Sequence, residues 1–255
     1  MAKAVNVTVS DGLGILRLGR NHGNAINGDL VVQLIGAVHE LEENAGVRGV
    51  LLAASGKLFS PGLDLRELIE LDQAGMARFL DRFSAAMLKL YTFSKPLVAA
   101  IHGHAIAGGF LLTLTTDWRM LREGAKVGLA EIRVGVPFPF GIGMILRDSV
   151  PRASLEALAL FGRNYDHREA LEANLVHEVR PAEGFEEACL ERLEEMATRD
   201  PNAYAVTKRY LRSATVERIR ANDAQLATEF LQCWFAPGTQ ERIREVVAGL
   251  REGED

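Results

Sequence analysis

The sequence predicts an α/β fold in its first two thirds and a helical C-terminal region. Short apolar runs at residues 50–54 and 97–101 have the composition of strands that are buried on both faces. Segments with apolar residues three or four positions apart separate these runs, and such crossover connections require a largely parallel sheet. From Pro151 onward the apolar spacing is typical of helices.

A hairpin and a helix come first. Apolar and polar residues alternate over 5–9 and over 13–18, with a glycine turn between them, which predicts a β-hairpin. Asp29 is the expected N-cap of a helix that ends near Asn44 and Gly46. Its apolar stripe consists of Leu30, Leu34, Ala37, Val38 and Leu41.

The later elements repeat this alternation. After the strand at 50–54 and its loop, a polar helical segment begins at Asp64 and leads into a longer helix that ends near residue 90. The strand at 97–101 leads through a glycine break at 107–109 to another helix start. The helices expected after Pro151 span 154–161, 167–173, 185–196, 201–211, 216–234 and 239–250.

Composition excludes several classes of function. The 255 residues are 48% hydrophobic and 25% charged, as in ordinary soluble domains. Because 29 Lys and Arg face 34 Asp and Glu, the net charge of −5 gives no global positive field to hold a nucleic acid or an anionic membrane. The two cysteines, Cys189 and Cys233, form no metal-binding pair and predict reduced thiols in a cytoplasmic protein.

Targeting and membrane segments are not expected. The chain runs from Met1 and Ala2 into the first strand pattern without an apolar or arginine-rich leader. The apolar stretch at 97–116 contains histidines, glycines and threonines, which would leave polar groups unsatisfied in lipid. A buried strand, a tight turn and a buried helix fit that stretch better.

Two segments share a buried strand, a glycine turn and a helix N-terminus: FSPGLDL at 59–65 and HGHAIAGG at 102–109. A helix start offers unpaired N–H groups, and glycine lets a ligand approach the backbone closely. Two such ends that converge can hold a carbonyl oxygen that becomes negative during a reaction. Glycine turns of this kind are commonly only turns, so the pattern alone leaves both interpretations open.

Four motifs in order resemble those of the enoyl-CoA hydratase/isomerase, or crotonase, superfamily. RNHGNAIN at 20–27 is similar to R-P-x-x-x-N-A-[IL]-[ND] without its proline, and LFSPGLDL at 58–65 is similar to F-[SC]-x-G-x-D-[IL]. KPLVAAIHG at 95–103 and AIAGG at 105–109 resemble K-P-[VT]-[IV]-A-A-[IV]-x-G and A-x-G-G-G. The resemblance implies a crotonase-like ββα spiral core over 1–190, with a helical region over 191–255 for oligomerisation and pocket closure.

The resemblance also implies the substrate, an acyl thioester of coenzyme A, with no metal or further cofactor required. Its thioester oxygen would accept hydrogen bonds from the backbone N–H groups of Leu63 and Gly108, each worth about 3 kcal/mol when negative charge develops. Backbone carbonyls near Pro61 and Leu65 would face the adenine. Asp64 lies in the same coenzyme A segment, and helix capping accounts for it without a catalytic role.

One departure from the family pattern bears on the reaction. Hydratases of the family carry a glutamate two residues after the last glycine of the triplet, where this chain has Leu111. The second family glutamate aligns with Glu131, which lies in a strand-like run. Hydration divides its proton transfers between two carboxylates, whereas moving a double bond from the 3- to the 2-position needs one base.

The sequence therefore predicts a 3-enoyl-CoA isomerase with Glu131 as the proton shuttle. We expect burial beside Leu111 to raise the pKa of this glutamate. Alternatives are a 2-enoyl-CoA hydratase, a decarboxylase or thioester hydrolase of the superfamily, and a coenzyme A thioester-binding protein without turnover. The structural alternative is that Glu131 is only an exposed acid near Arg133.

Other residues receive secondary predictions. His102 is expected to be a hydrogen-bonded structural residue and His104 a candidate for the pocket, since no third ligand completes a zinc site. Phe138 and Phe140 indicate either an apolar acyl pocket or packing. Oligomerisation, as a homotrimer or a dimer of trimers by the resemblance, is expected from apolar residues in excess of what one sheet face needs: Phe230, Leu231, Trp234 and Phe235.

Overall fold

The larger sheet has six strands, and all but one of its neighbouring pairs are parallel. The computed structural model describes residues 3–252, so Met1 and Ala2 and the absence of a leader predicted from them lie outside the described residues. The order is β1-β2-β3-β4-β6-β9, and only β1 and β2 pair antiparallel. The strands are β1 (Val5–Ser10), β2 (Leu13–Leu18), β3 (Gly49–Ala54), β4 (Leu97–Ile101), β6 (Trp118–Arg122) and β9 (Glu178–Arg180). The predicted α/β class and opening hairpin are confirmed.

A smaller sheet lies beside it, made of β5 (Ala105–Ile106), β7 (Lys126–Gly128) and β8 (Asn164–Asp166). β7 pairs parallel with β5 and antiparallel with β8. The prediction that the chain is wholly helical after Pro151 is wrong at β8 and β9. Each of these strands has three residues, too few for an alternating pattern, and forms by pairing with a distant strand.

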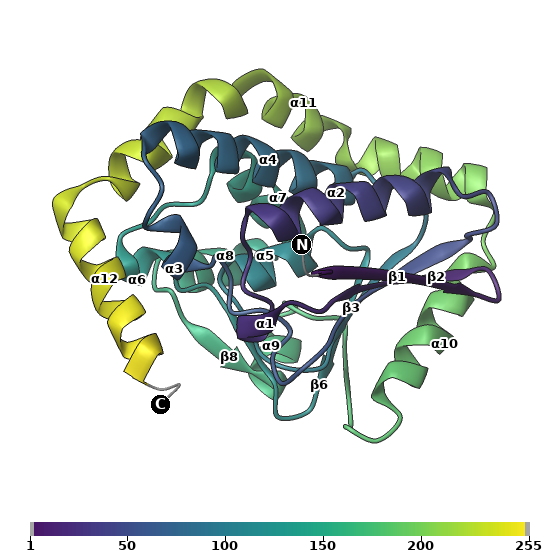
Figure 1. Cartoon of the computed structure of the whole chain (residues 1–255). Coiled ribbons are helices and arrows are strands. Elements are labelled where there is room, and N and C mark those ends of the chain that lie inside the picture. Colours follow the sequence, from purple (N-terminus) through teal and green to yellow (C-terminus); the bar gives the residue numbers. More distant parts are fainter. Residues whose placement is uncertain (1–2, 253–255) are drawn as a thin grey trace.

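The helices surround the two sheets (Figure 1). They are α1 (Asn21–Asn24), α2 (Gly28–Glu43), α3 (Leu65–Leu68), α4 (Gln73–Tyr91), α5 (Gly108–Leu114), α6 (Glu131–Val134), α7 (Phe140–Ser149), α8 (Arg152–Ala159), α9 (His167–Glu172), α10 (Phe185–Ala197), α11 (Pro201–Trp234) and α12 (Pro237–Glu252). α2 begins two residues earlier than expected, because Asn27 rather than Asp29 is its N-cap and accepts a hydrogen bond from the Leu30 N–H.

The central strand β3 is buried on both faces, as its apolar composition predicts. Alternate side chains such as Leu52 join the main core with α2 and α4, whereas Leu51 joins a smaller core with α10. The division predicted between residues 190 and 191 falls inside α10, where Cys189 and Leu193 are both buried against the sheet. The helix therefore packs with the core.

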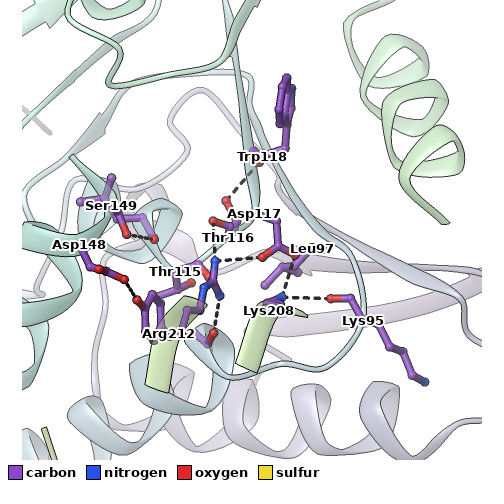
Figure 2. A network of polar contacts seen from close by, with 12 residues as sticks. Lys95, Leu97, Thr115, Thr116, Asp117, Trp118, Asp148, Ser149, Lys208 and Arg212 are labelled. Carbon is purple, nitrogen blue, oxygen red and sulfur yellow. Dashed lines mark hydrogen bonds and ion pairs between the residues drawn. The ribbon is translucent and has the colours of Figure 1, made fainter. Parts of the chain in front are cut away.

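Asp117, just before β6, anchors α11 to the sheet (Figure 2). Its carboxylate forms ion pairs with Lys208 at 2.7 Å and Arg212 at 2.9 Å, and it accepts hydrogen bonds from the Leu97 N–H and the Tyr204 hydroxyl, each at 2.9 Å. α11 is one helix where two were predicted: it continues through residues 212–215, and Val216 and Ile219 beyond them are buried in the main core. An unbroken α11 carries its C-terminal end toward α6 and α12.

The apolar residues at the end of α11 are buried within the chain itself. Phe230, Leu231 and Trp234 are only 2%, 7% and 0% exposed, so the expectation that they need a partner subunit is wrong. α12 folds back to pack against α3 and α6 (Figure 1). Within residues 3–252, no helix is long and apolar enough to cross a membrane.

Candidate active site

Most of the predicted site residues meet at one cavity of about 450 Å³. Pro61, Leu63, Leu65, Gly108 and Glu131 all line it. The other described residues of its wall are Ala107, Ala130, Arg133, Val134, Val136, Trp234 and Val246, so within residues 3–252 Glu131 is the only acid that lines it. A cavity of similar volume beside α11, lined in part by Lys208 and Arg212, contains none of the predicted site residues.

The two glycine loops are joined by their backbones. The Ile26 N–H donates to the Gly62 carbonyl at 2.7 Å, and the Ile106 N–H donates to the Ser60 carbonyl at 3.0 Å. A Cβ on Gly109 would lie 2.2 Å from the Ser60 carbonyl oxygen, an approach that only glycine permits. The loop at 59–65 is thus fixed both to the segment around Ile26 and to the second glycine loop, more than forty residues further along the chain.

The predicted pair of backbone donors lies at this junction. A Cβ on Gly108 would be 3.6 Å from the Leu63 nitrogen, so the two residues are adjacent in space. Gly108 is the first residue of α5, where N–H groups have no partner in the helix. Among the described residues, no acceptor is hydrogen-bonded to the N–H of Leu63 or of Gly108. Two adjacent unpaired donors in one cavity are the arrangement that an oxyanion requires.

Ala107, immediately before this donor, has a strained backbone. Its φ of 52° and ψ of −132° fall in a region that residues with a Cβ rarely adopt. Its N–H donates to the Gly128 carbonyl at 2.8 Å, and its carbonyl accepts from Phe110 and Leu111, which hold the conformation. The available sequence signal was an alanine in place of the first glycine of the A-x-G-G-G pattern.

We expect Ala107→Gly to raise the free energy of unfolding by about 1 kcal/mol. Glycine removes about 1–3 kcal/mol of strain, and its greater freedom in the unfolded chain offsets part of that gain. Urea denaturation measures the change. Ala100→Gly, at a buried position in β4, is the matched control and should lower the same free energy. A lower free energy of unfolding in both variants would contradict backbone strain at Ala107.

Glu131 begins the short helix α6, so its assignment to a strand-like run is wrong. The Ala130 N–H donates to its Oε2 at 2.9 Å, and the residue is half-buried in the cavity wall. Burial raises the pKa of Glu131 to about 7, against the opposing effect of backbone hydrogen bonds and of the Arg133 charge. This environment differs from that of a surface acid, and a carboxyl with a pKa near neutrality is suited to general-base catalysis.

Leu111 is buried in the core at 3% exposure and is not among the residues that line the cavity. It lies three residues after Gly108 on α5, which places the two on the same helix face. The expected rise in the pKa of Glu131 therefore follows from burial, with Val134 and Val136 in the wall beside it.

The C-terminal helix holds α6 in place, a contact that sequence reasoning missed. Arg242 Nε donates to the Val134 carbonyl at 3.2 Å, and Thr239 Oγ1 donates to the Gly135 carbonyl at 3.3 Å. Neither residue belongs to a motif, so no local pattern indicated the contact. These bonds tie the end of α6 to α12.

Asp64 does not line the cavity. Its carboxylate caps α3 by accepting a hydrogen bond from the Arg66 N–H at 3.2 Å, as the capping interpretation predicts. It also forms an ion pair with Arg20 at 2.6 Å, and Arg20 in turn pairs with Glu67. This buried pair fixes the loop that carries Leu63.

The histidines and phenylalanines do not contribute to the cavity. His102 Nε2 lies 2.9 Å from the Gly56 carbonyl, which confirms its structural role. His104 is exposed and accepts from the Lys126 N–H at 3.0 Å, so its expected place in the pocket is wrong. Phe138 packs against the core, and neither it nor Phe140 lines the cavity. In the described part of the chain, no group of three or more potential ligands could hold a metal ion.

Comparison with known proteins identifies the family. A model described as "Enoyl-CoA hydratase/isomerase" matches residues 8–245. The chain belongs to the enoyl-CoA hydratase/isomerase family. A putative enoyl-CoA hydratase of Thermus thermophilus is 33% identical over 192 residues, which cover 74% of this chain and 75% of that protein. The mitochondrial enoyl-CoA delta isomerase 1 of Homo sapiens is 28% identical over 226 residues, 86% of this chain and 75% of that protein.

The family fold extends over nearly the whole chain. The crystal structure of human mitochondrial delta3-delta2-enoyl-CoA isomerase superposes with a TM-score of 0.94 at 25% identity, and the match covers 99% of this chain and 100% of that one. The predicted crotonase-like core is therefore confirmed. Because relatives named as hydratases and as isomerases both occur, the family identifies an acyl-CoA enzyme without choosing between the two reactions.

Proposed function

We propose that this enzyme converts 3-enoyl-CoA thioesters to 2-enoyl-CoA thioesters, with Glu131 as its single proton shuttle. The supporting observation is that, among the described residues, Glu131 is the only acid lining the cavity that also contains the unpaired N–H groups of Leu63 and Gly108. A hydratase divides its proton transfers between two carboxylates, and at the position of the other family glutamate this chain has Leu111 in the buried core.

The proposed reaction moves one proton between two carbons. The thioester oxygen accepts hydrogen bonds from the N–H groups of Leu63 and Gly108. The Glu131 carboxylate removes a proton from C2, the electrons of that C–H bond form a double bond between C1 and C2, and the carbonyl electrons move to the oxygen, where the charge of the resulting dienolate is stabilised. The same carboxyl then returns the proton to C4, which leaves the double bond between C2 and C3.

The cavity wall supports this role. Its apolar side chains, including Leu65, Val134, Val136 and Val246, limit water around the base and keep its pKa near neutrality. Pro61 and Leu65 belong to the loop that would face the adenine of coenzyme A. The coenzyme enters as part of the substrate, so the proton transfer needs no metal or further cofactor.

The purified enzyme should be tested with 3-hexenoyl-CoA and 2-hexenoyl-CoA, with identification of each product. We expect 3-hexenoyl-CoA to yield 2-hexenoyl-CoA, and 2-hexenoyl-CoA to yield little 3-hydroxyhexanoyl-CoA. Efficient hydration of 2-hexenoyl-CoA would contradict the proposed isomerase and indicate a hydratase, the activity named for the Thermus thermophilus relative. Binding of both thioesters without turnover would favour a coenzyme A thioester-binding protein.

The activity should depend on pH through Glu131. A base must be deprotonated, so kcat/KM should rise about tenfold per pH unit below pH 7 and level off above it. The Arg133 charge opposes the rise in the pKa, so Arg133→Gln should move the rising limb to higher pH. Initial rates between pH 5 and 9 measure both profiles. A flat profile would show that another group carries the proton.

The family resemblance also leads us to propose a cytoplasmic homotrimer or dimer of trimers. This proposal no longer depends on Phe230, Leu231 or Trp234, which are buried inside the chain. Light scattering at micromolar concentration should give three or six times the monomer mass of 27.9 kDa. A monomer under these conditions would contradict it.

A further inference from the structure

The Ser60 hydroxyl lies at the junction of the two glycine loops and is hydrogen-bonded in both directions. Ser60 is 0% exposed. Its Oγ donates to the Asn24 carbonyl at 2.9 Å and accepts from the Gly62 N–H at 3.2 Å. The side chain therefore links Asn24 to the residue immediately before Leu63, the first of the two proposed oxyanion donors.

Asn24 is a fixed point for this hydroxyl. The residue is buried, and its side-chain amide donates to the carbonyls of Ser55 at 2.8 Å and Leu58 at 3.1 Å. Its Oδ1 accepts from the Arg20 N–H at 2.9 Å. Because three backbone groups hold its side chain, Asn24 gives Ser60 a rigid partner.

The backbone of Ser60 holds the second glycine loop. Its carbonyl accepts from the Ile106 N–H at 3.0 Å, and its N–H donates to the His104 carbonyl at 3.2 Å. A Cβ on Gly109 would lie 2.8 Å from the Ser60 Cβ, so the start of α5 packs directly against this residue. One serine thus contacts the first loop through its side chain and the second loop through its main chain.

The contacts around Gly62 set the direction of the Leu63 N–H. Ile26 and Leu63 form an isolated parallel bridge. The Ile26 N–H donates to the Gly62 carbonyl at 2.7 Å, and the Ile26 carbonyl accepts from the Asp64 N–H at 2.8 Å. Since the residues on either side of Leu63 make both bonds of this bridge, the Leu63 N–H points away from Ile26. A Cβ on Gly62 would lie 3.0 Å from the Gly108 nitrogen, so a rotation at Gly62 changes the separation of the two donors.

We propose that Ser60 is a positioning residue, whose hydroxyl holds Gly62 so that the N–H groups of Leu63 and Gly108 converge on the thioester oxygen. Donors stabilise a developing charge most when they are fixed before the reaction begins. Loss of one oxyanion donor lowers kcat by about 10²–10³, and a displaced donor forfeits part of that effect. The inference rests on the proposed function in one respect, that a thioester oxygen lies between these two N–H groups.

Ser60→Ala removes the hydroxyl and keeps the backbone contacts. We expect kcat for 3-hexenoyl-CoA to fall about tenfold and KM to change by less than about threefold, because the oxygen is more negative in the transition state. Isotope-edited infrared spectra of bound hexanoyl-CoA, with a heavy carbon isotope at the thioester carbonyl, report on the hydrogen bonds to its oxygen. Native enzyme should shift the carbonyl band to lower wavenumber, and Ser60→Ala should lose about half of that shift, since one of two donors is displaced.

Thr116→Val is the matched control for the loss of a buried hydroxyl. The Thr116 hydroxyl is hydrogen-bonded to the carbonyls of Thr113 at 2.7 Å and Trp118 at 3.1 Å, and neither carbonyl belongs to a glycine loop. Thr116→Val should lower the free energy of unfolding but leave kcat and the carbonyl band at their native values.

Ser60→Cys is the conservative variant, at a position where the family pattern admits cysteine. A thiol is a larger group that donates and accepts more weakly than a hydroxyl. We therefore expect its kcat and its carbonyl band to fall between those of the native enzyme and Ser60→Ala. If Ser60→Ala does not fold, a native band in Ser60→Cys would contradict the role of the hydroxyl.

Two results with a folded Ser60→Ala variant would overturn the inference. One is a native kcat with a native carbonyl band, and the other is a lower kcat with a native band, which would place the effect outside the oxyanion site. If the native enzyme binds hexanoyl-CoA without shifting its carbonyl band, the proposed function fails as well. A native shift that persists in Ser60→Ala removes only the role of Ser60, so the two failures are distinguishable.

Discussion

Glu131→Gln is expected to lower turnover of 3-enoyl-CoA by at least about a hundredfold while leaving thioester binding within a few-fold. Glutamine keeps the size and much of the hydrogen bonding of the side chain but cannot take a proton, and general-base catalysis contributes about 10²–10⁴ in rate. Steady-state kinetics give the turnover, and titration with hexanoyl-CoA gives the binding. Near-normal turnover would show that another residue moves the proton.

The same substitution should stabilise the fold at pH 8. The pKa of Glu131 is raised from 4.5 to about 7, so between these values the unfolded carboxyl releases its proton while the folded one keeps it. The stability of the native enzyme therefore falls as the pH rises through this window. The shift in the pKa corresponds to about 3 kcal/mol. Because water reaches the half-buried residue, we expect Glu131→Gln to raise the free energy of unfolding at pH 8 by about 1–2 kcal/mol.

Urea denaturation at pH 8 and pH 4 checks this effect, which should disappear at pH 4 where both states are protonated. Glu191→Gln, at an exposed position on α10, is the matched control and should change neither stability nor turnover. A Glu131→Gln variant with lower activity and lower stability at pH 8 would indicate a structural acid.

Gly108→Pro should lower kcat by about 10²–10³ with a smaller effect on binding. Proline deletes one of the two backbone donors, and the thioester oxygen is more negative in the transition state than in the bound substrate. Gly108 is the first residue of α5, the position where a helix tolerates proline best. Circular dichroism establishes that the variant remains folded before its kinetics are compared.

Gly108→Ala tests whether catalysis depends on the N–H donor at this position or on the absence of a side chain there. It keeps the N–H, and its Cβ would make only ordinary contacts, 3.5 Å from Gly62 Cα and 3.6 Å from the Leu63 nitrogen. We expect its loss of kcat to be less than about tenfold. Similar losses of kcat in Gly108→Ala and Gly108→Pro would mean that Gly108 serves packing rather than catalysis. Equal losses of binding and turnover in Gly108→Pro would mean the same.

The sequence by itself determined the elements whose pattern is local. Alternation over 13–18 and the apolar run over 97–101 predicted strands that the structure contains, because side-chain periodicity reports directly on burial. The family resemblance also indicated which residues would meet. Leu63, Gly108 and Glu131 line one cavity although they come from three separate segments.

Only the tertiary structure decided the features that depend on contacts between distant segments. Lys208 and Arg212 of α11 both reach Asp117, and no local pattern reports such a pairing. The strand-like run at Glu131 became a helix held by α12. Trp234, predicted to face a partner subunit, instead lines the cavity of Glu131. Periodicity shows that a side chain is apolar and buried, but what covers it depends on how the rest of the chain folds over it.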